Sequence, residues 1–550
     1  MDTQNDLISL IEASIRNHWY QDALTDYKGI TFQYKDIGTI IEKMHIAFQY
    51  AGIKQGDKIA LCGRNSAHWG VTFLGILTYG AVAVPILHEF KADNIHNVVN
   101  HSGAKLLFVG DQAWENLNEA EMPALKAIIG LKNFDLLVTH SKRIRYAHGH
   151  RNEEFGKKHP CCFTAENVAY KHPHPDELAV INYTSGTTGY SKGVMLSYRS
   201  FISNLHHIHN KIGLKPQSRI VCMLPMGHIF GLIFDFLYGI TTGSHIWFLT
   251  RMPSPKIIAE SFSEIRPHLI SCVPLVVEKI FKQNILPKVD NNLGKLLFRL
   301  PIVSEHLKEQ TRHKAMEVFG GNFFQIIVGG APFNAEIEAF LRKINFPYTI
   351  AYGMTECGPL ICFSNWNEIK FSSCGKTVAN METKVLSDQP EKIPGELICR
   401  GKNLMDGYYL NQKATQQAID KDGWLHTGDM AIKDAEGNIY IKGRCKNMLL
   451  SASGQNIYPE EIEAKLNNMP LICESLVIMK DGKLVALIYP EYNEVIAKGM
   501  SKQQLEAALN ASRTELNATL PPYSQITKVK IFNEEFEKTA KKSIKRFMYQ

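Results

Sequence analysis

Strand-like and helix-like segments alternate along the first part of the chain, and this alternation limits the possible folds more than any other feature. The segment 34–53 carries apolar residues at helical spacing, and 57–65, with its apolar run at 59–62, then predicts a buried strand. The segment 70–86 predicts a helix leading into a strand, and 104–111 a further strand. The same rhythm returns within 218–344. Helices between consecutive strands are typical of an α/β fold with largely parallel sheets.

The pattern of predicted elements changes after residue 390. Short strands between Gly and Asp turns predict a small antiparallel β unit that ends near Arg444. Beyond it, a helix, a hairpin around an Asp-Gly turn, a second helix and a strand predict an α+β domain of about 100 residues. We therefore expect an α/β protein with a large N-terminal domain of parallel or mixed sheets flanked by helices, a small β unit, and a small α+β C-terminal domain. The polar, proline-rich segment 153–177 predicts a surface connection.

Composition excludes several classes of protein. With 45% hydrophobic and 21% charged residues the chain is a typical soluble globular protein, and a net charge of +7 over 550 residues does not point to nucleic acid. The 11 cysteines are scattered without zinc-like spacing, which favours reduced thiols. We see neither a signal peptide nor an apolar span of about 20 residues. We expect a cytoplasmic protein with at most peripheral membrane contact.

The most informative stretch is a glycine- and threonine-rich loop that follows a buried strand. The apolar segment 178–183 leads into Thr-Ser-Gly-Thr-Thr-Gly, and Lys192 follows shortly after. Glycines let backbone N–H groups turn toward a phosphate, the Ser and Thr hydroxyls donate to its oxygens, and lysine adds charge. The spacing does not fit a Walker A loop. A turn that binds nothing is the alternative, but this composition after a strand favours a phosphate site.

The order Tyr-Thr-Ser-Gly-Thr-Thr-Gly-x-x-Lys-Gly resembles the signature of the adenylate-forming (AMP-binding) superfamily. That superfamily includes acyl-CoA synthetases, nonribosomal peptide adenylation domains and beetle luciferases. GGAP at 329–332, YGMTE at 352–356, GWLHTGD at 423–429 and the segment around Arg444 follow in the family's order. The N-terminal region is most similar to bacterial long-chain fatty acid CoA ligases.

The resemblance implies a site for ATP and Mg²⁺. In the family, the residue that matches Tyr352 stacks on adenine, and those that match Thr355 and Glu356 contact phosphate and hold Mg²⁺. Asp429 matches the residue that accepts from both ribose hydroxyls, and Arg444 a ribose-contacting arginine. The nucleotide-binding positions implied are Thr184, Ser185, Gly186, Thr187, Thr188, Gly189, Gly330, Ala331, Pro332, Tyr352, Gly353, Asp429 and Arg444.

The same resemblance implies a reaction in two steps and a mobile C-terminal domain. A carboxylate first attacks ATP to give acyl-AMP and pyrophosphate, and the thiol of coenzyme A then displaces AMP. Between the steps the C-terminal domain rotates about a hinge that matches Lys446. The implied domains are an AMP-binding domain, 1–445, and a mobile lid, 446–550. Gly454 matches a position on the coenzyme A path, where the lack of a side chain allows close approach.

The acid substrate is predicted from the segment around His228. LPMGHIFG resembles a family motif whose histidine faces the acid's carboxylate, although an isolated histidine among apolar residues is more often part of the core. The apolar helix expected over 229–240 would line the acyl pocket, and Asp235 is its one candidate partner for an ammonium group. A medium- or long-chain fatty acid fits best. The catalytic residues we expect are Lys542, Lys192, His228 and Thr355.

The C-terminal tail departs from the family pattern at one position. Lys538-Thr539 and Ile544-Lys545-Arg546 match the last motif, but Ser543 stands where the family has its catalytic lysine. A serine cannot supply the charge. Lys542, or less readily Lys541, could replace that lysine. Alternatively, adenylation proceeds without it, or the protein has lost this half-reaction. We favour Lys542.

Two other functions stay open. A fatty-acyl-AMP ligase would transfer the acyl group to a carrier protein, and a non-catalytic homologue would only bind acyl groups or nucleotides. No surplus segment lies between Asp429 and Arg444, which favours ligation to coenzyme A over the first alternative. The retention of nearly all motif residues favours an enzyme over the second.

Overall fold

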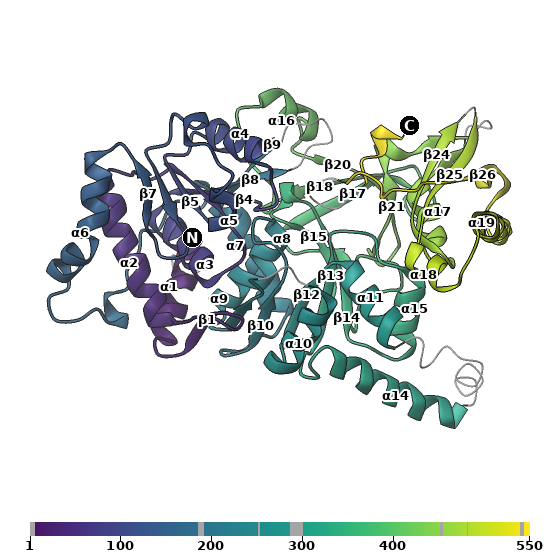
Figure 1. The fold of residues 1–550 in the computed structure, drawn as a ribbon, viewed down its shortest axis with the longest axis horizontal. Coiled ribbons are helices and arrows are strands. Elements are labelled where there is room, and N and C mark those ends of the chain that lie inside the picture. The colour runs from purple at the N-terminus through teal and green to yellow at the C-terminus, as the bar shows by residue number, and fades with distance from the viewer. Residues whose placement is uncertain are drawn as a thin grey trace.

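The computed structural model describes residues 6–184, 192–250, 254–285, 301–451, 455–480, 482–538 and 544–549. Figure 1 shows a large N-terminal region, drawn from purple to green, and a small C-terminal region in yellow-green at its right edge. The large region contains two mixed sheets and a small antiparallel sheet. This α/β architecture confirms the fold class predicted from the sequence.

The first sheet has eight strands, and its five central strands, β8, β4, β3, β5 and β6, are parallel. Antiparallel strands complete both edges. The strands β8 and β9, which flank the phosphate-loop segment in the sequence, are neighbours in this sheet. In spatial order the strands are β19 (Gly407–Tyr408), β9 (Lys192–Ser197), β8 (Leu178–Thr184), β4 (Val82–Ile86), β3 (Lys58–Cys62), β5 (Leu106–Val109), β6 (Ala127–Gly130) and β7 (Leu136–Thr139).

The second sheet has nine strands, six of them parallel from β14 to β1. The carboxyl ends of β13 and β14 carry the GGAP and YGMTE motifs. In order the strands are β16 (Lys376–Thr377), β15 (Leu360–Phe363), β14 (Tyr348–Gly353), β13 (Gln325–Gly329), β12 (Leu269–Cys272), β10 (Arg219–Cys222), β11 (His245–Phe248), β1 (Asp22–Asp26) and β2 (Thr31–Gln33).

The helix α3 (Ala67–Tyr79) lies deep in the main hydrophobic core. Eleven of its 13 residues are buried, as expected for a helix that is apolar on all sides. Ser66 caps its N-terminus by accepting from the backbone N–H of Trp69, and Gly80 ends it in the left-handed conformation. Phe73 packs edge-on against Phe236, which joins α3 to the helix that follows His228. This core therefore ties the first sheet to the second.

The other helices cover the sheets and form the C-terminal region. They are α1 (Leu7–Asn17), α2 (Tyr34–Ala51), α4 (Ala92–Ser102), α5 (Asp111–Trp114), α6 (Lys142–Lys158), α7 (Tyr198–Lys211), α8 (Ile229–Gly231), α9 (Tyr238–Thr241), α10 (Pro255–Ile265), α11 (Pro274–Asn284), α14 (Pro301–Val318), α15 (Ala335–Lys343), α16 (Gln412–Ala418), α17 (Pro459–Leu466), α18 (Tyr492–Ala497) and α19 (Lys502–Asn517). A π-helical turn, η4 (Leu232–Leu237), joins α8 to α9.

The small sheets lie toward the C-terminus. The four-stranded antiparallel sheet contains β17 (Met381–Leu386), β18 (Gly395–Gly401), β20 (Leu425–Lys433) and β21 (Ile439–Arg444). A two-stranded sheet follows, β22 (Leu449–Leu450) with β23 (Asn456–Ile457). The C-terminal sheet contains β24 (Ile472–Lys480), β25 (Lys483–Pro490) and β26 (Ile526–Ile531), and it has its own hydrophobic cluster with α17 and α19. The predicted hairpin is β24–β25.

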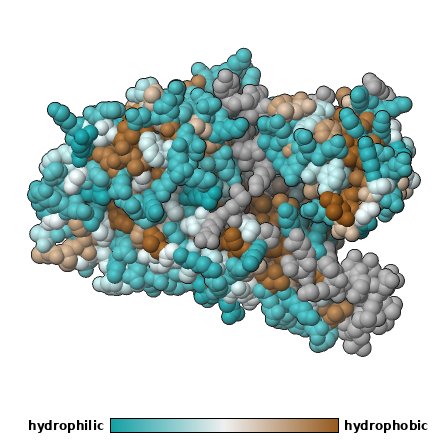
Figure 2. Space-filling view, viewed as in Figure 1, coloured by the Kyte–Doolittle hydropathy of each residue, from teal (hydrophilic) through white to brown (hydrophobic). Residues whose placement is uncertain are grey.

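Two sequence expectations need correction. The segment 153–177 is not only a surface connection, because α6 continues to Lys158 and the side chains of Val168 and Tyr170 are buried. The antiparallel unit begins at β17, before residue 390. Within the described ranges, no helix combines the length and apolarity that crossing a membrane requires. The face drawn in Figure 2 is mostly hydrophilic, with hydrophobic side chains in several separate groups.

Candidate active site

The carboxyl ends of β13 and β14 place two of the motifs side by side. These strands are parallel, with Gly329 opposite Ala351, so Gly330 and Tyr352 follow the paired ends. Gly330 has a φ of +87°, a conformation that residues with a side chain rarely adopt, and with Ala331 and Pro332 it is exposed. Ligands in α/β sheets bind outside the carboxyl ends of the strands. GGAP and the start of YGMTE therefore occupy a position suited to a ligand.

A hydrogen-bonded group links β14 to the small antiparallel sheet. The Tyr352 hydroxyl donates to Asp429 Oδ2 over 2.6 Å, and Arg444 Nε lies 2.7 Å from Asp429 Oδ1. The hairpin β20–β21 sets the second contact, because Asp429 and Arg444 are opposite each other in its register. Burial raises the pKa of Asp429, and the nearby Arg444 partly offsets this. Both carboxylate oxygens of Asp429 thus have partners.

A second group links the end of the phosphate-loop segment to Glu356. Thr184 and Lys192 are partners in the β8–β9 ladder, so that ladder closes the segment between them. Lys192 Nζ lies 4.7 Å from the centre of the Tyr408 ring, and the Tyr408 hydroxyl donates to Glu356 Oε1 over 2.8 Å. The candidate phosphate-binding residues Ser185, Gly186, Thr187, Thr188 and Gly189 lie outside the described residues.

Thr355 and Glu356 lie in a short 3₁₀ turn, η5 (Thr355–Cys357), directly after β14 and Gly353. Thr355 is buried, whereas Glu356 is partly exposed. Among the described residues, no three His, Cys, Asp or Glu side chains gather closely enough to hold a metal ion alone. Mg²⁺ is commonly held by one or two carboxylates together with nucleotide phosphates, so the single carboxylate of Glu356 fits that ion.

His228 stands at the N-terminus of α8, and the residues that follow it are almost all buried. A Cβ atom added at Gly329 would lie 3.1 Å from Phe230 Cζ, so the start of this helix contacts the end of β13. Asp235 lies in the π-helical turn with an exposed fraction of 0%. In the described part of the chain, neither of its carboxyl oxygens has a hydrogen-bond partner. Burial raises the pKa of Asp235 to about 8.

The C-terminal candidates are only partly described. Lys446 lies in a 3₁₀ turn, η6 (Cys445–Asn447), between the β21 strand and the C-terminal region. Gly454, Lys542, and its alternatives Lys541 and Ser543 lie outside the described residues.

Three other basic residues of the tail have acidic partners. Lys538 Nζ is 2.7 Å from Glu474, Lys545 Nζ is 2.9 Å from Glu537, and Arg546 pairs with Glu463. These three basic groups therefore support the C-terminal fold.

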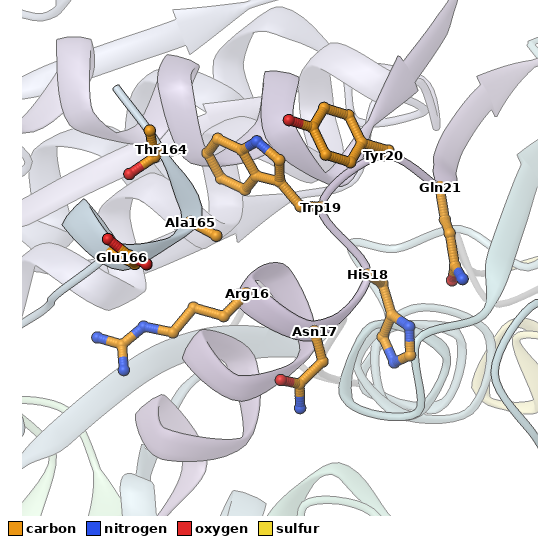
Figure 3. Close-up of a pocket in the computed structure, with 9 residues that line it drawn as sticks. All are labelled: Arg16, Asn17, His18, Trp19, Tyr20, Gln21, Thr164, Ala165 and Glu166. Carbon is orange, nitrogen blue, oxygen red and sulfur yellow. The ribbon is translucent and has the colours of Figure 1, made fainter. Parts of the chain in front are cut away.

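A separate surface cavity of about 480 Å³ lies at the end of α1, far along the chain from the motifs. Figure 3 shows Trp19 and Tyr20 on one side of it and Arg16 and Asn17 on the other. Arg16 already donates to the backbone oxygen of Val168. None of the candidate residues lines this cavity, so it does not mark the nucleotide site.

Sequence reasoning missed one residue of the site, Tyr408. The segment 395–409 lies between YGMTE and GWLHTGD, but none of its residues was assigned a role. The signal available was the position of Tyr408 directly after Gly407 in this segment. Its two contacts could not be read from the chain, because Lys192 and Glu356 are distant from it in sequence.

The chain belongs to the family of AMP-binding enzymes. The model of that family matches residues 11–409, and the model of the AMP-binding enzyme C-terminal domain matches residues 446–549. This match confirms the family resemblance inferred from the motifs.

Named relatives fall into more than one class of ligase. The human long-chain-fatty-acid–CoA ligase ACSBG2 is 25% identical over 488 residues, which are 83% of this chain and 72% of the relative. The 4-coumarate–CoA ligase 1 of Narcissus pseudonarcissus is 26% identical over 472 residues, 82% of this chain and 76% of the relative. The structure of the anthranilate CoA ligase AuaEII with anthranoyl-AMP matches with a TM-score of 0.77 at 18% identity, covering 99% of this chain and 96% of that one. This last likeness concerns the fold.

Proposed function

We propose that the protein activates a medium- or long-chain fatty acid with ATP, forming acyl-AMP and pyrophosphate, and then transfers the acyl group to coenzyme A with release of AMP. One observation carries this proposal. Two groups of linked side chains meet at the end of β14, where Tyr352 and Glu356 are four residues apart. One group contains Lys192, Tyr408 and Glu356, and the other contains Tyr352, Asp429 and Arg444. Residues that the family uses for ATP are thereby gathered from segments far apart in the chain.

The geometry supports distinct roles within this site. Asp429 is an acceptor-only group that can take hydrogen bonds from ribose hydroxyls, and Arg444 orients it. Tyr352 offers a ring for adenine next to that carboxylate. Lys192 supplies positive charge where the phosphate-loop segment ends, and Thr355 lies next to Glu356 in the YGMTE motif. Mg²⁺, held by Glu356, would neutralise phosphate charge. Two anions react in the first step, so positioning and cationic stabilisation should dominate catalysis.

The apolar helix after His228 supports a fatty acid as the substrate. The turn Leu232–Leu237 contributes buried Leu, Ile and Phe side chains, which suit a hydrocarbon chain better than a polar acid. Relatives named for 4-coumarate make an aromatic acid the competing substrate.

ATP–pyrophosphate exchange with straight-chain acids from hexanoate to stearate, and with 4-coumarate, tests this assignment. We expect exchange with at least one straight-chain acid. Exchange with 4-coumarate alone would refute the fatty acid, and exchange with none would refute the adenylation.

The choice of coenzyme A over a carrier protein is supported by the β20–β21 hairpin. Only residues 434–438 lie between these strands, so no inserted element is present there to hinder rotation of a C-terminal domain about Lys446. Chromatographic detection of acyl-CoA with free coenzyme A is the test, and acyl-AMP accumulating without acyl-CoA would instead indicate a fatty-acyl-AMP ligase.

Two further residues have proposed roles in these steps. Gly454 would lie on the coenzyme A path after the rotation, and Lys542 would act in adenylation. Lys542→Ala compared with Lys541→Ala in pyrophosphate exchange separates the two lysines.

A further inference from the structure

Tyr408 lies between a candidate cation and a candidate metal ligand. Its ring faces Lys192 Nζ at 4.7 Å, and its hydroxyl donates to Glu356 Oε1 over 2.8 Å. The ion pairs found among the described residues do not include one between Lys192 and Glu356. One buried side chain, 8% exposed, therefore contacts both groups by different parts of its surface.

The backbone holds Tyr408 firmly in this place. β19 pairs with β9, so that Tyr408 is opposite Val194, two residues after Lys192. The Tyr408 backbone N–H donates to the Thr415 hydroxyl over 2.9 Å, which ties β19 to α16. The strand β9, which begins at Lys192 where the phosphate-loop segment ends, thus also fixes the position of Tyr408.

We propose that Tyr408 is a positioning residue that keeps the Lys192 ammonium and the Glu356 carboxylate apart and correctly aimed for metal-bound ATP. This inference rests on the proposed function, and it assigns Tyr408 no contact with the reacting atoms.

General physical principles support the proposed effect of Tyr408 on Glu356 and its proposed effect on Lys192. The Tyr408 hydroxyl donates a hydrogen bond to Glu356 Oε1, which leaves Oε2 as the oxygen available to bind a cation. The ring attracts the ammonium through its quadrupole without neutralising it. A direct Lys192–Glu356 ion pair would instead cancel the two charges that the nucleotide and the metal require.

Two variants separate the contributions of the hydroxyl and the ring. Tyr408→Phe removes the hydrogen bond to Glu356 and keeps the ring beside Lys192, whereas Tyr408→Leu removes both. Tyr409→Phe is the matched control, because Tyr409 is the next residue and its ring faces Lys58 and His101 instead.

Two binding measurements without turnover are made on the full-length protein. Calorimetry with ATP in EDTA reports the site without metal. Electron paramagnetic resonance of free Mn²⁺ reports the metal affinity of the ATP complex.

We expect Tyr408→Phe to weaken Mn²⁺ binding about tenfold and to leave ATP binding in EDTA unchanged. A tenfold loss of metal affinity is at the lower end of the losses seen when a group that orients a metal ligand is removed. Tyr408→Leu should also weaken ATP binding in EDTA about fivefold, the size of one cation–π contact whose cation is still reached by solvent, as Lys192 is. Tyr409→Phe should match the wild type in both.

Wild-type Mn²⁺ affinity in Tyr408→Phe would overturn the proposal. Equal loss of both affinities in Tyr408→Phe would overturn it too, because it would show a general structural role. If Tyr408→Leu does not fold, as judged by circular dichroism, the Tyr408→Phe result decides. Failure of the wild type to bind ATP would refute the proposed function itself, which is a separate outcome.

Discussion

Two buried aspartates of this protein have opposite environments. Asp429 is 5% exposed and has Tyr352 and Arg444 as partners for its two oxygens. Asp235 is 0% exposed, and within the described residues its oxygens form no hydrogen bond of ordinary geometry, although the Ser271 hydroxyl and the backbone of Met223 and Leu224 lie near enough to oppose the rise in its pKa. Burial raises the pKa of both carboxyls, but an arginine partly offsets this only at Asp429.

The difference separates the nucleotide region from the apolar helix. A carboxylate that accepts from Tyr352 and pairs with Arg444 can also accept from a ligand. The carboxyl in the apolar helix, whose pKa burial raises to about 8, keeps its proton at neutral pH, and a neutral group suits the neighbourhood of a hydrocarbon chain. The two regions of the proposed site thus differ in the partners of their carboxyl groups as well as in composition.

The largest effect should come from removing the Asp235 carboxyl. Its pKa is about 8 in the folded protein, well above the ordinary value, so the folded state binds the proton more tightly than the unfolded state. Wild-type stability should therefore fall as the pH rises from about 5 to about 8, by about 1.4 kcal/mol per pH unit. Asp235→Asn cannot lose this proton, and its stability relative to wild type should rise by about 4 kcal/mol over that range.

Urea unfolding of both proteins across that pH range measures this difference. Asp422→Asn, which changes an exposed turn carboxyl and keeps Asp235, is the control and should show the same pH dependence as the wild type. Parallel curves for wild type and Asp235→Asn would show that Asp235 is ionised in the folded protein and would remove the contrast with Asp429.

The next largest effect should come from Asp429→Ala. The variant would lose the two hydrogen bonds to ribose that we propose for this charged acceptor, which together correspond to about a 100-fold rise in the KM for ATP. ATP–pyrophosphate exchange gives the KM, and calorimetry gives the affinity without turnover. Asp422→Ala is the matched control. Unchanged ATP binding in a folded Asp429→Ala protein would mean that Asp429 only anchors Tyr352 and Arg444.

The sequence was sufficient for elements whose pattern is local. The helix α2, the strand β8 and the hairpin β24–β25 were predicted because apolar periodicity and turn residues lie within each segment. The continuation of α6 to Lys158 was missed because that helix buries little more than Ile144 and Ala147. A helix with so small an apolar face has hardly any periodic signal.

Most residues of the candidate site could be predicted one at a time from the sequence, but their arrangement in space could not. The motifs identified Lys192, Glu356 and Asp429, because family resemblance acts on short runs of sequence. Tyr408 lies between two of these groups only because β19 pairs with β9, although these strands are about 200 residues apart in the sequence. Pairing between distant strands is a tertiary property, and no local pattern contains it.

The smallest effect should come from Arg444→Gln, which weakens one of the two contacts to Asp429. The Arg444 side chain is 57% exposed, so solvent screens its pairing with the carboxylate. We expect about a threefold rise in the KM for ATP at low ionic strength, and a smaller rise at high salt, because exposed ion pairs are screened.

Measuring the KM of both proteins at low and high salt tests this. The Asp235 effect serves as the internal contrast, since a fully buried carboxyl is screened little and its pH-dependent stability should not change with salt. A salt-independent loss in Arg444→Gln would instead mean that Arg444 acts as a desolvated ligand of ATP, and the nucleotide region would then resemble the apolar helix in being closed to solvent.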